Sequence, residues 1–268
     1  MNILEEIIQT KAKEVALRQS LYPVKLLEQS MHFDVAPVSM KKYLQRPDKS
    51  GVIAEIKRKS PSKGVINEGF SVERVSIAYM QAGASALSVL TDKQYFGGSS
   101  DDLLEARAFN YCPILRKDFI IDEYQIIEAK SIGADTILLI AAALSPDRIK
   151  VLAAMAKSLK LEVLLEVHSL EELRAIDLTD VDMVGVNNRN LKTFEVSTNV
   201  SKELAEHIPA GIVKVTESGL NNPAEVIELK KYGYEGFLIG EAFMKTSQPG
   251  DACAKFIQGL RQAEIPVQ

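Results

Sequence analysis

Short apolar runs recur along the chain at near-regular spacing. Eight runs of five or six residues, rich in Val, Ile and Leu, begin at positions 52, 86, 113, 136, 162, 183, 213 and 236. Successive runs start 21 to 34 residues apart. Runs of this length that are bounded by turn residues predict buried β-strands.

Helical patterns fill the intervals between these runs. "SVERVSIAYMQAG", "DEYQIIEAKSIG", "SPDRIKVLAAMAKSL" and "NPAEVIELKKYG" each begin with a Ser, Asp or Asn cap, and several end in a glycine suited to a helix C-terminus. Eight strand–helix units of about 25 residues predict an α/β fold, a (β/α)8 TIM barrel. A doubly wound open sheet is the alternative, but no GxGxxG or GxxxxGK[ST] loop follows the first strand.

The first 47 residues lie outside this repeat. They contain one amphipathic helix at 3–19 and two shorter helical patterns around Leu26 and Tyr43. We expect a single barrel domain over 1–268, with 1–47 as its N-terminal helical extension. The extension either caps one end of the barrel or contributes to closure over a substrate, and spacing leaves both interpretations open.

Composition and charge exclude several classes of protein. The net charge of −4 argues against nucleic-acid or membrane-surface partners. Cys112, Cys253 and the three histidines show no metal-ligand spacing, so we expect no metal. The N-terminal segment lacks the apolar core of a signal peptide, and the longest apolar run is too short to span a bilayer. We therefore expect a cytoplasmic protein.

Reactive residue types gather where the predicted strands end. Barrel enzymes place their sites at the C-terminal ends of the strands, and residues i and i+2 of a strand share a face. Carboxylates and lysines at one barrel mouth would shift one another's pKa values, as is typical of an active site. Solvated strand ends explain any single member equally well. The strand-end residues are Glu55, Lys57, Lys117, Asp118, Glu166, Asn187, Arg189, Glu217, Ser218 and Glu241.

Glycines and cations near the same mouth indicate an anionic, phosphorylated substrate. Gly219 and Gly240 follow the last two strands, where barrels often bind phosphate with backbone N–H groups. The segment "SPSKG" at 60–64 adds hydroxyl groups and a lysine. Phe96 is a candidate aromatic wall. His168, two positions past Glu166, is predicted to lie at the surface.

At these residues the sequence resembles the indole-3-glycerol-phosphate synthase family of tryptophan biosynthesis. The matching motifs are "AEIKRKSPSKG", "LTDKQYFGGS", "PILRKDFIID", "GADTILLI", "GVNNRNLKTFEV", "ESGL" and "FLIGEAFM", in this order along nearly the whole chain. The resemblance implies a monofunctional bacterial carboxy-lyase that works without a cofactor or metal. Its substrate would be 1-(2-carboxyphenylamino)-1-deoxyribulose 5-phosphate, and its products indole-3-glycerol phosphate, carbon dioxide and water.

The resemblance also implies roles for individual residues. Lys117 would be the general acid of ring closure, with a pKa that we expect to be tuned toward neutrality, and Lys57 would hold the substrate carboxylate. Glu55 and Glu166 would exchange protons. The implied catalytic set is Glu55, Lys57, Lys117, Glu166, Asn187, Glu217 and Ser218, and the implied substrate-binding set is Ser60, Phe96, Phe119, Arg189, Gly219, Gly240 and Glu241.

Three other functions fit parts of the pattern. A phosphoribosylanthranilate isomerase would need a Cys–Asp pair at strand ends, and Cys112 lies at the wrong end of its strand. A Schiff-base aldolase would use Lys117 as a nucleophile. A sugar-phosphate sensor would keep the pocket without turnover. We expect a monomer or a weak homodimer.

Overall fold

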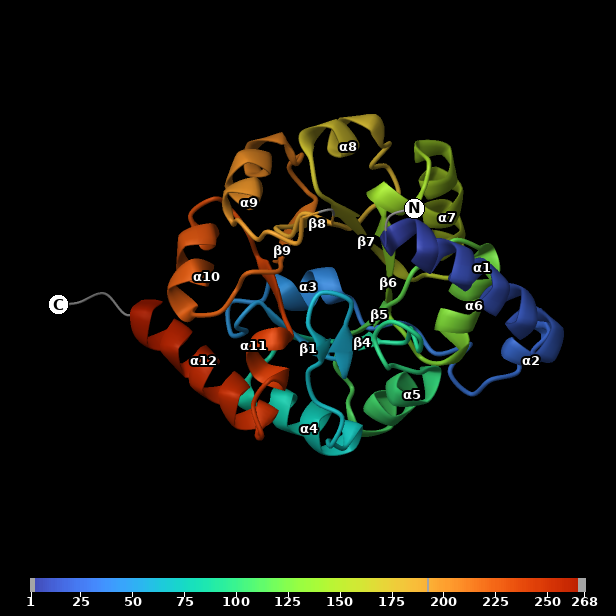
Figure 1. The fold of residues 1–268 in the computed structure, drawn as a ribbon, viewed down its shortest axis with the longest axis horizontal. Coiled ribbons are helices and arrows are strands. Elements are labelled where there is room, and N and C mark those ends of the chain that lie inside the picture. The colour runs from blue at the N-terminus through green and yellow to red at the C-terminus, as the bar shows by residue number, and fades with distance from the viewer. Residues whose placement is uncertain (1–2, 192, 265–268) are drawn as a thin grey trace.

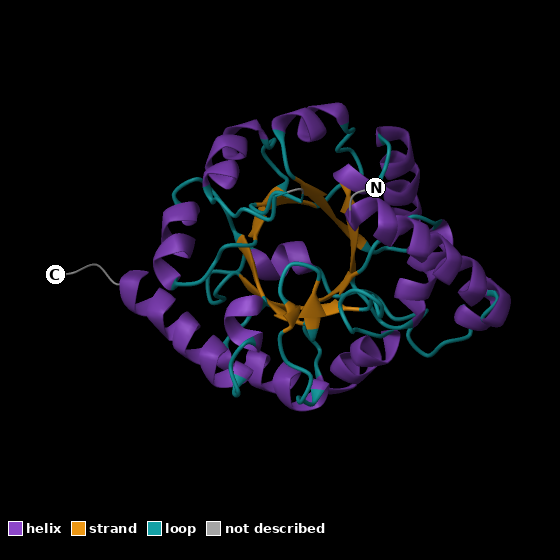
Figure 2. Ribbon diagram, viewed as in Figure 1, coloured by secondary structure: helices purple, strands orange, loops and turns teal. Residues whose placement is uncertain are grey.

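The predicted barrel is confirmed in the computed structural model, which describes residues 3–191 and 193–264 (Figures 1 and 2). Its eight parallel strands pair in chain order, and the last pairs with the first to close the barrel. The eight strands are β1 (Val52–Ile56), β4 (Ala86–Leu90), β5 (Ile114–Lys117), β6 (Thr136–Ile140), β7 (Glu162–Val167), β8 (Met183–Asn187), β9 (Val213–Glu217) and β10 (Gly236–Ile239).

Helices surround the barrel and begin at the expected caps. Ser71, Ser99 and Asp122 each accept a hydrogen bond from a backbone N–H in the first turn of the helix that follows. None of the helices described here is both long and apolar enough to cross a membrane. The outer helices are α4 (Val72–Ala82), α5 (Ser100–Phe109), α6 (Glu123–Ser131), α7 (Pro146–Ser158), α8 (Leu170–Ala175), α9 (Asn199–Leu204), α10 (Pro223–Lys230), α11 (Glu241–Met244) and α12 (Pro249–Glu264), with 3-10 turns η1 (Ala141–Ala143) and η2 (Ala205–His207).

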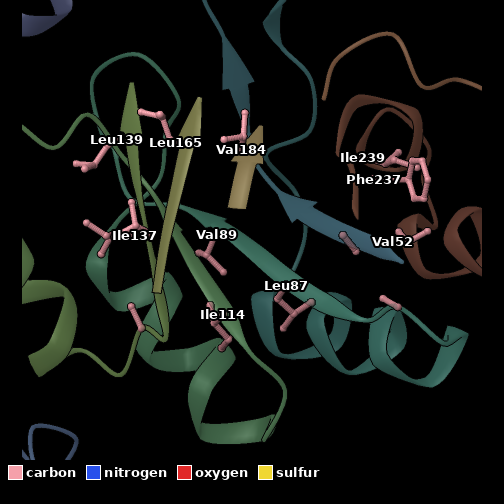
Figure 3. Packing of buried hydrophobic residues seen from close by; sticks show 14 of the residues in the cluster. Val52, Leu87, Val89, Ile114, Ile137, Leu139, Leu165, Val184, Phe237 and Ile239 are labelled. Atoms are coloured by element: carbon pink, nitrogen blue, oxygen red, sulfur yellow. The ribbon is translucent and has the colours of Figure 1, made fainter. Parts of the chain in front are cut away.

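Strand alternation divides the apolar side chains into two cores. One set packs between the strands and the outer helices (Figure 3) and includes Val52, Leu87, Val89, Ile137 and Ile239. The other set fills the barrel interior and includes Ile53, Ala86, Leu115, Leu164, Met183, Val213, Val215 and Leu238. On β1, β7 and β9 the interior series continues upward into Glu55, Glu166 and Glu217. The alternation therefore places buried apolar layers below a charged layer at the barrel mouth.

The segment after β1 forms a short hairpin that the sequence pattern did not indicate. Two-residue strands β2 (Lys59–Ser60) and β3 (Gly64–Val65) pair antiparallel. Arg58 turns away from the interior, as alternation predicts, and donates to both carboxylate oxygens of Asp102. Its guanidinium also lies 4.9 Å from the ring centre of Phe70. These contacts fix the base of the hairpin beside the mouth.

The N-terminal extension reaches both ends of the barrel. It consists of α1 (Ile3–Leu21), α2 (Val24–Leu27) and α3 (Met40–Leu44), as the pattern predicted. α3 lies within the ring of strands in Figure 2, and its Met40 and Leu44 join the interior core. α1 instead contributes side chains to the cavity at the mouth. The extension thus contributes α3 to the barrel interior and α1 to the wall of the cavity at the mouth.

A buried lysine holds α1 against the barrel. The side chain of Lys11 is 1% exposed, and its Nζ lies 2.9 Å from Asp92 Oδ2 and from Asp118 Oδ1. Burial lowers the pKa of Lys11, but Asp118 and Asp92 outweigh this effect and raise it well above its usual value. Asp92 also accepts the backbone N–H of Tyr95 and of Phe96. One ammonium therefore joins α1 to the turns that follow β4 and β5.

Replacing Lys11 should destabilise the fold strongly. In Lys11→Ala, Asp92 and Asp118 lose the ammonium that neutralises them while they stay buried. Removing one partner of a buried ion pair costs about 3–5 kcal/mol. Denaturant unfolding followed by circular dichroism should show this loss. Lys13→Ala, on the exposed face of the same helix, should change the free energy of unfolding by less than about 0.5 kcal/mol, and equal effects of the two substitutions would contradict the assignment.

Candidate active site

The barrel mouth opens into a cavity of about 430 Å³. All fourteen residues that the sequence singled out for catalysis or substrate binding line it. They come from the end of every strand of the barrel, or from the loop that follows it, except β6. Glu55 lies on β1 and Lys57 just after it, Ser60 lies in the hairpin, Phe96 in the loop after β4, Lys117 on β5 with Phe119 just after it, and Glu166 on β7. Asn187 lies on β8 with Arg189 in the loop after it, Glu217 lies on β9 with Ser218 and Gly219 in the turn after it, and Gly240 and Glu241 follow β10.

Lys117 lies at the centre of the charged layer. Its Nζ donates to Glu166 Oε2 and to Glu217 Oε2, both at 2.8 Å. Glu166 also accepts from Asn187 Nδ2 at 3.1 Å. The Lys117 side chain is 12% exposed, so the two ion pairs form largely out of water. Three non-adjacent strands thus aim their terminal side chains at one point.

The direction of the Lys117 pKa shift corrects our expectation. We expected a pKa tuned toward neutrality by partial burial. Burial does lower the pKa, but Glu166, Glu217 and Glu55 together raise it well above its usual value. Three carboxylates surround this ammonium, and their attraction exceeds the desolvation that disfavours its charge. Lys117 is therefore a fully protonated hydrogen-bond donor at any physiological pH.

The carboxylates around Lys117 outnumber the ammonium groups by one. Glu55, Glu166 and Glu217 face two ammonium groups, those of Lys57 and Lys117. Burial, followed by repulsion from Glu166, raises the pKa of Glu217 to about 7. Although burial opposes it, the charge of Lys117 lowers the pKa of Glu166 to about 2. Among the described residues, the buried Oε1 of Glu217 has no hydrogen-bond partner. Of Glu166 and Glu217, Glu217 is thus the one that titrates near neutral pH.

A second ion pair lies at the end of β1. Lys57 Nζ lies 2.7 Å from Glu55 Oε1, and the lysine side chain is 16% exposed toward the cavity. The carboxylate of Glu55 packs against the backbone just after β10, where a Cβ added at Gly240 would lie 2.4 Å from Glu55 Oε1. Glycine at 240 therefore leaves the space that Glu55 occupies.

The chain turns sharply after β9. Ser218 has a φ of 66° and Gly219 a φ of 78°, so two consecutive residues adopt the left-handed conformation. For serine this conformation is strained. The buried Asn188 supports the turn, because its Nδ2 donates at 3.0 Å both to Ser218 O and to Thr216 Oγ1. This strained turn faces the cavity beside Gly240.

Charged groups at the rim surround the same corner of the cavity. Lys63 Nζ lies 3.4 Å from Glu241 Oε1, and Arg189 Nη2 lies 3.8 Å from Glu241 Oε2. The three side chains come from the β2–β3 hairpin, the β8 loop and the start of α11. An anion entering between the two glycine turns would meet both cations.

The opposite wall of the cavity is apolar. The rings of Phe96 and Phe119 lie 5.9 Å apart between centroids, tilted at 40°. Sequence reasoning missed the remaining apolar lining. Leu138 and Ile140 share the interior parity of β6, which was the available signal. The spacing of residues in α1 could not show that its side chains reach the cavity, because their position depends on how the extension docks on the barrel. The missed apolar residues include Ile3, Leu4, Ile7, Leu138, Ile140, Leu191, Phe194 and Val196.

The prediction for His168 is wrong. We expected a surface histidine, but the side chain is only 13% exposed and Nε2 lies 3.4 Å from Glu166 Oε1. The reason is α8, which covers the ring by presenting Glu172 on its first turn. Cys112, by contrast, is buried just before β5 as expected, at the opposite end of that strand from Lys117.

The arrangement suits acid–base chemistry on an anionic aromatic substrate. It combines ammonium donors, one ionised and one protonated carboxylate, an apolar slot and glycine turns beside cations. Over residues 3–191 and 193–264, no group of three or more His, Cys, Asp and Glu side chains is placed to hold a metal ion.

Comparison with known proteins gives consistent results over nearly the whole chain. The sequence model of the family described as "Indole-3-glycerol phosphate synthase" matches residues 4–256. An indole-3-glycerol phosphate synthase of Bacteroides thetaiotaomicron is 48% identical over 97% of this chain and 99% of its own length. One of Chromobacterium violaceum is 45% identical over 95% of this chain and 97% of its own.

Solved structures share the fold at low sequence identity. A mutant tryptophan synthase alpha-subunit from Pyrococcus furiosus superposes with a TM-score of 0.61 at 16% identity, covering 80% of this chain and 99% of that one. This likeness supports the barrel architecture alone.

The raised pKa of Glu217 predicts a pH-dependent stability. A carboxyl whose folded-state pKa of about 7 exceeds its ordinary 4.5 binds its proton more tightly when the protein is folded. Its stabilising contribution is complete below pH 4.5 and is lost as the pH rises through about 7. Unfolding free energies measured from pH 4.5 to 8 should therefore favour Glu217→Gln increasingly over the wild type, by up to about 3 kcal/mol.

The control for this measurement is Glu203→Gln, which removes an exposed glutamate on α9. Its difference from the wild type should stay constant over the same range. A constant difference for Glu217→Gln as well would show that Glu217 titrates normally.

Proposed function

The chain belongs to the indole-3-glycerol phosphate synthase family, carboxy-lyases of tryptophan biosynthesis, and from its cavity we propose how its residues perform the reaction. The reaction joins the aromatic ring of 1-(2-carboxyphenylamino)-1-deoxyribulose 5-phosphate to its own ketone carbon, then releases carbon dioxide and water. The observation that carries the proposal is the ammonium of Lys117, held 2.8 Å from both Glu166 and Glu217 at the floor of the cavity.

The phosphate binds at the corner formed by Gly219 and Gly240. Backbone N–H groups at such turns approach an anion closely, because no Cβ intervenes. Ser60 adds a hydroxyl group, and Arg189 adds a positive charge on the rim. Glu241 contributes through its backbone and through its hold on Arg189, since its own carboxylate would repel the phosphate.

The aromatic ring lies in the apolar slot between the barrel mouth and α1. Phe96 and Phe119 form one wall of this slot. Lys57 binds the ring carboxylate, since its ammonium projects into the cavity from the end of β1. Two anchors at opposite ends of the substrate bring the ring carbon close to the ketone, which lowers the entropic part of the barrier.

Ring closure uses Lys117 as the acid. As the ring carbon attacks the ketone carbon, negative charge develops on the ketone oxygen, and the ammonium donates its proton to that oxygen. An alkoxide is basic enough to take a proton even from an ammonium with a raised pKa. Glu166 and Glu217 hold the donor in place, and Asn187 orients Glu166. Ser218 shapes the turn that closes this side of the cavity.

Carbon dioxide and water leave in the later steps. The C–C bond to the carboxylate breaks, and its electron pair returns to the ring. The new hydroxyl then departs with a proton from an ammonium, for which Lys57 is placed. A carboxylate, Glu55 or Glu166, removes the proton from the adjacent carbon. The indole ring results; the carboxylate returns its proton to one lysine, and a proton from solvent restores the other.

The charge on Lys117 also distinguishes this reaction from its alternatives. A Schiff-base aldolase requires a neutral amine as nucleophile, and the three carboxylates oppose deprotonation of Lys117. A sensor without turnover would not require the strained turn and the paired charges.

We further propose that residues 1–268 act as one domain in the cytoplasm, as a monomer or weak homodimer. The two cysteines are unpaired and buried, as is usual in a reducing compartment. Sedimentation of the purified protein tests the oligomeric state.

Removing the Lys117 ammonium should abolish most catalysis with little effect on binding. We expect Lys117→Ala to lower kcat by about 10²–10⁴, the range for a positioned general acid. KM should change much less, because phosphate and carboxylate keep their anchors. Indole fluorescence from the deoxyribulose phosphate substrate measures both constants. Lys231→Ala, an exposed lysine following α10, is the control.

Borohydride reduction tests whether Lys117 forms a Schiff base with the substrate. Reduction in the presence of substrate should add no mass to the protein. An adduct on Lys117 would favour Schiff-base chemistry, and near-normal turnover of Lys117→Ala would remove this residue from the mechanism.

The phosphate corner is tested by Gly219→Ala. A Cβ at Gly219 would meet Val196 Cγ1 at 2.5 Å and would strain a residue whose φ is 78°. A strain of about 1–3 kcal/mol in this turn should weaken competitive inhibition by inorganic phosphate about tenfold. Gly211→Ala has a similar φ of 90° but open space around it, so it controls for backbone strain alone. Equal phosphate inhibition of both variants would exclude the corner as the anion site.

A further inference from the structure

His168 is the one imidazole that contacts the charged layer among the described residues. It directly follows β7 and precedes α8, and the ring does not line the cavity. Its Nε2 lies 3.4 Å from Glu166 Oε1, and its Nδ1 lies 3.5 Å from Glu172 Oε2. Both ring nitrogens are buried, and no ideally oriented hydrogen bond to another described residue satisfies them.

This geometry favours one protonation state of the ring. A neutral imidazole has one N–H donor and one lone pair. With a carboxylate oxygen at each nitrogen, the lone pair of a neutral ring would face a negative charge. The imidazolium instead presents a donor to both carboxylates. Small movements of the side chains would bring either pair within hydrogen-bond distance.

The three carboxylates nearest the ring all favour its positively charged form. Glu166 comes from β7, Glu172 from α8 and Glu217 from β9, while Lys117 lies beyond Glu166. Burial lowers the pKa of His168, but the hydrogen bond and charge of Glu172, with the charge of Glu166, raise it above the usual 6.5. The backbone of His168 is also fixed, since its N–H donates to Glu172 Oε2 at 2.7 Å.

We propose that His168, as an imidazolium held between Glu166 and Glu172, is a positioning residue. It determines which of the two carboxylates bound to Lys117, Glu166 or Glu217, is the one that binds a proton. Its charge lies on the Glu166 side of Lys117, so it stabilises the ionised form of Glu166 and leaves the proton on Glu217. Without this charge, the pKa values of the two carboxylates would be closer to each other. Glu166 and Glu217 would then no longer have clearly separate protonation states.

The inference rests on the proposed function for its kinetic part only. The apparent pKa values of such a pair belong to both carboxylates together. In His168→Asn, loss of the positive charge should raise the acid-side pKa of kcat/KM by about one unit, which is about tenfold less activity below that pKa. At alkaline pH the variant should recover to within about threefold of the wild type. A purely structural role would lower activity equally at every pH.

NMR titration of the imidazole rings tests the charge state independently of activity. The chain has three histidines, and His168→Asn identifies the signal of His168. We expect a pKa above 6.5 for His168, and a lower value in Glu172→Gln, where one carboxylate is lost. His207→Asn, near the surface beside Glu206, is the control and should leave the pH profile unchanged.

The outcomes separate the two proposals. A His168 pKa at or below 6.5, or an unchanged acid limb in a folded His168→Asn, overturns the role of His168. His168→Gln replaces His168→Asn if that variant fails to fold, and titration of the wild type and Glu172→Gln decides the charge state in any case. Absence of synthase activity in the wild type would instead refute the proposed function while leaving the titration result standing.

Discussion

Closing eight parallel strands into one barrel forces every second side chain of each strand into a narrow shared interior. That space is filled from below by Met40 and Leu44 of α3 and by apolar residues such as Leu164 and Val215. The uppermost positions of the same series face the cavity, where ionisable side chains are needed for acid–base chemistry. They are occupied by Glu55, Glu166, Glu217 and Lys117, which are all largely buried. The position of the site follows from this stacking order.

Because several charges are buried in one layer, the pKa of each group depends strongly on the charged groups next to it. Three carboxylates around two ammonium groups leave one negative charge in excess, and this excess together with burial raises the pKa of Glu217 to about 7. The distribution is uneven because Glu166 has two further partners, Asn187 and His168, that Glu217 lacks. Different pKa values for otherwise similar carboxylates are the physical basis of separate acid and base roles.

The extension completes the molecule at both ends by different interactions. At the bottom, α3 supplies apolar volume to the barrel interior. At the mouth, α1 is held by the ion pairs of Lys11 with Asp92 and Asp118. The same two carboxylates accept the backbone N–H groups of Phe96 and Phe119, which line the cavity. The same buried ammonium therefore fixes both the helix that covers the mouth and the loops that form the aromatic wall. Stability of the extension and shape of the cavity are coupled through this contact.

The hydrophobic pattern by itself determined the eight strands, their alternation and the end of the barrel at which the ionisable residues gather. This was possible because period-two alternation and strand-end position are local properties of the chain. The family motifs named the fourteen cavity residues, since each belongs to a short recognisable segment. Other features depend on groups distant in sequence. The pKa of Lys117 moved opposite to our expectation because its carboxylates come from β1, β7 and β9. His168 is covered by α8, and Lys11 is buried only because α1 docks on two loops about 80 and 110 residues away. Burial and the sum of surrounding charges exist only in the folded chain, so the tertiary structure alone decided the protonation states of the site.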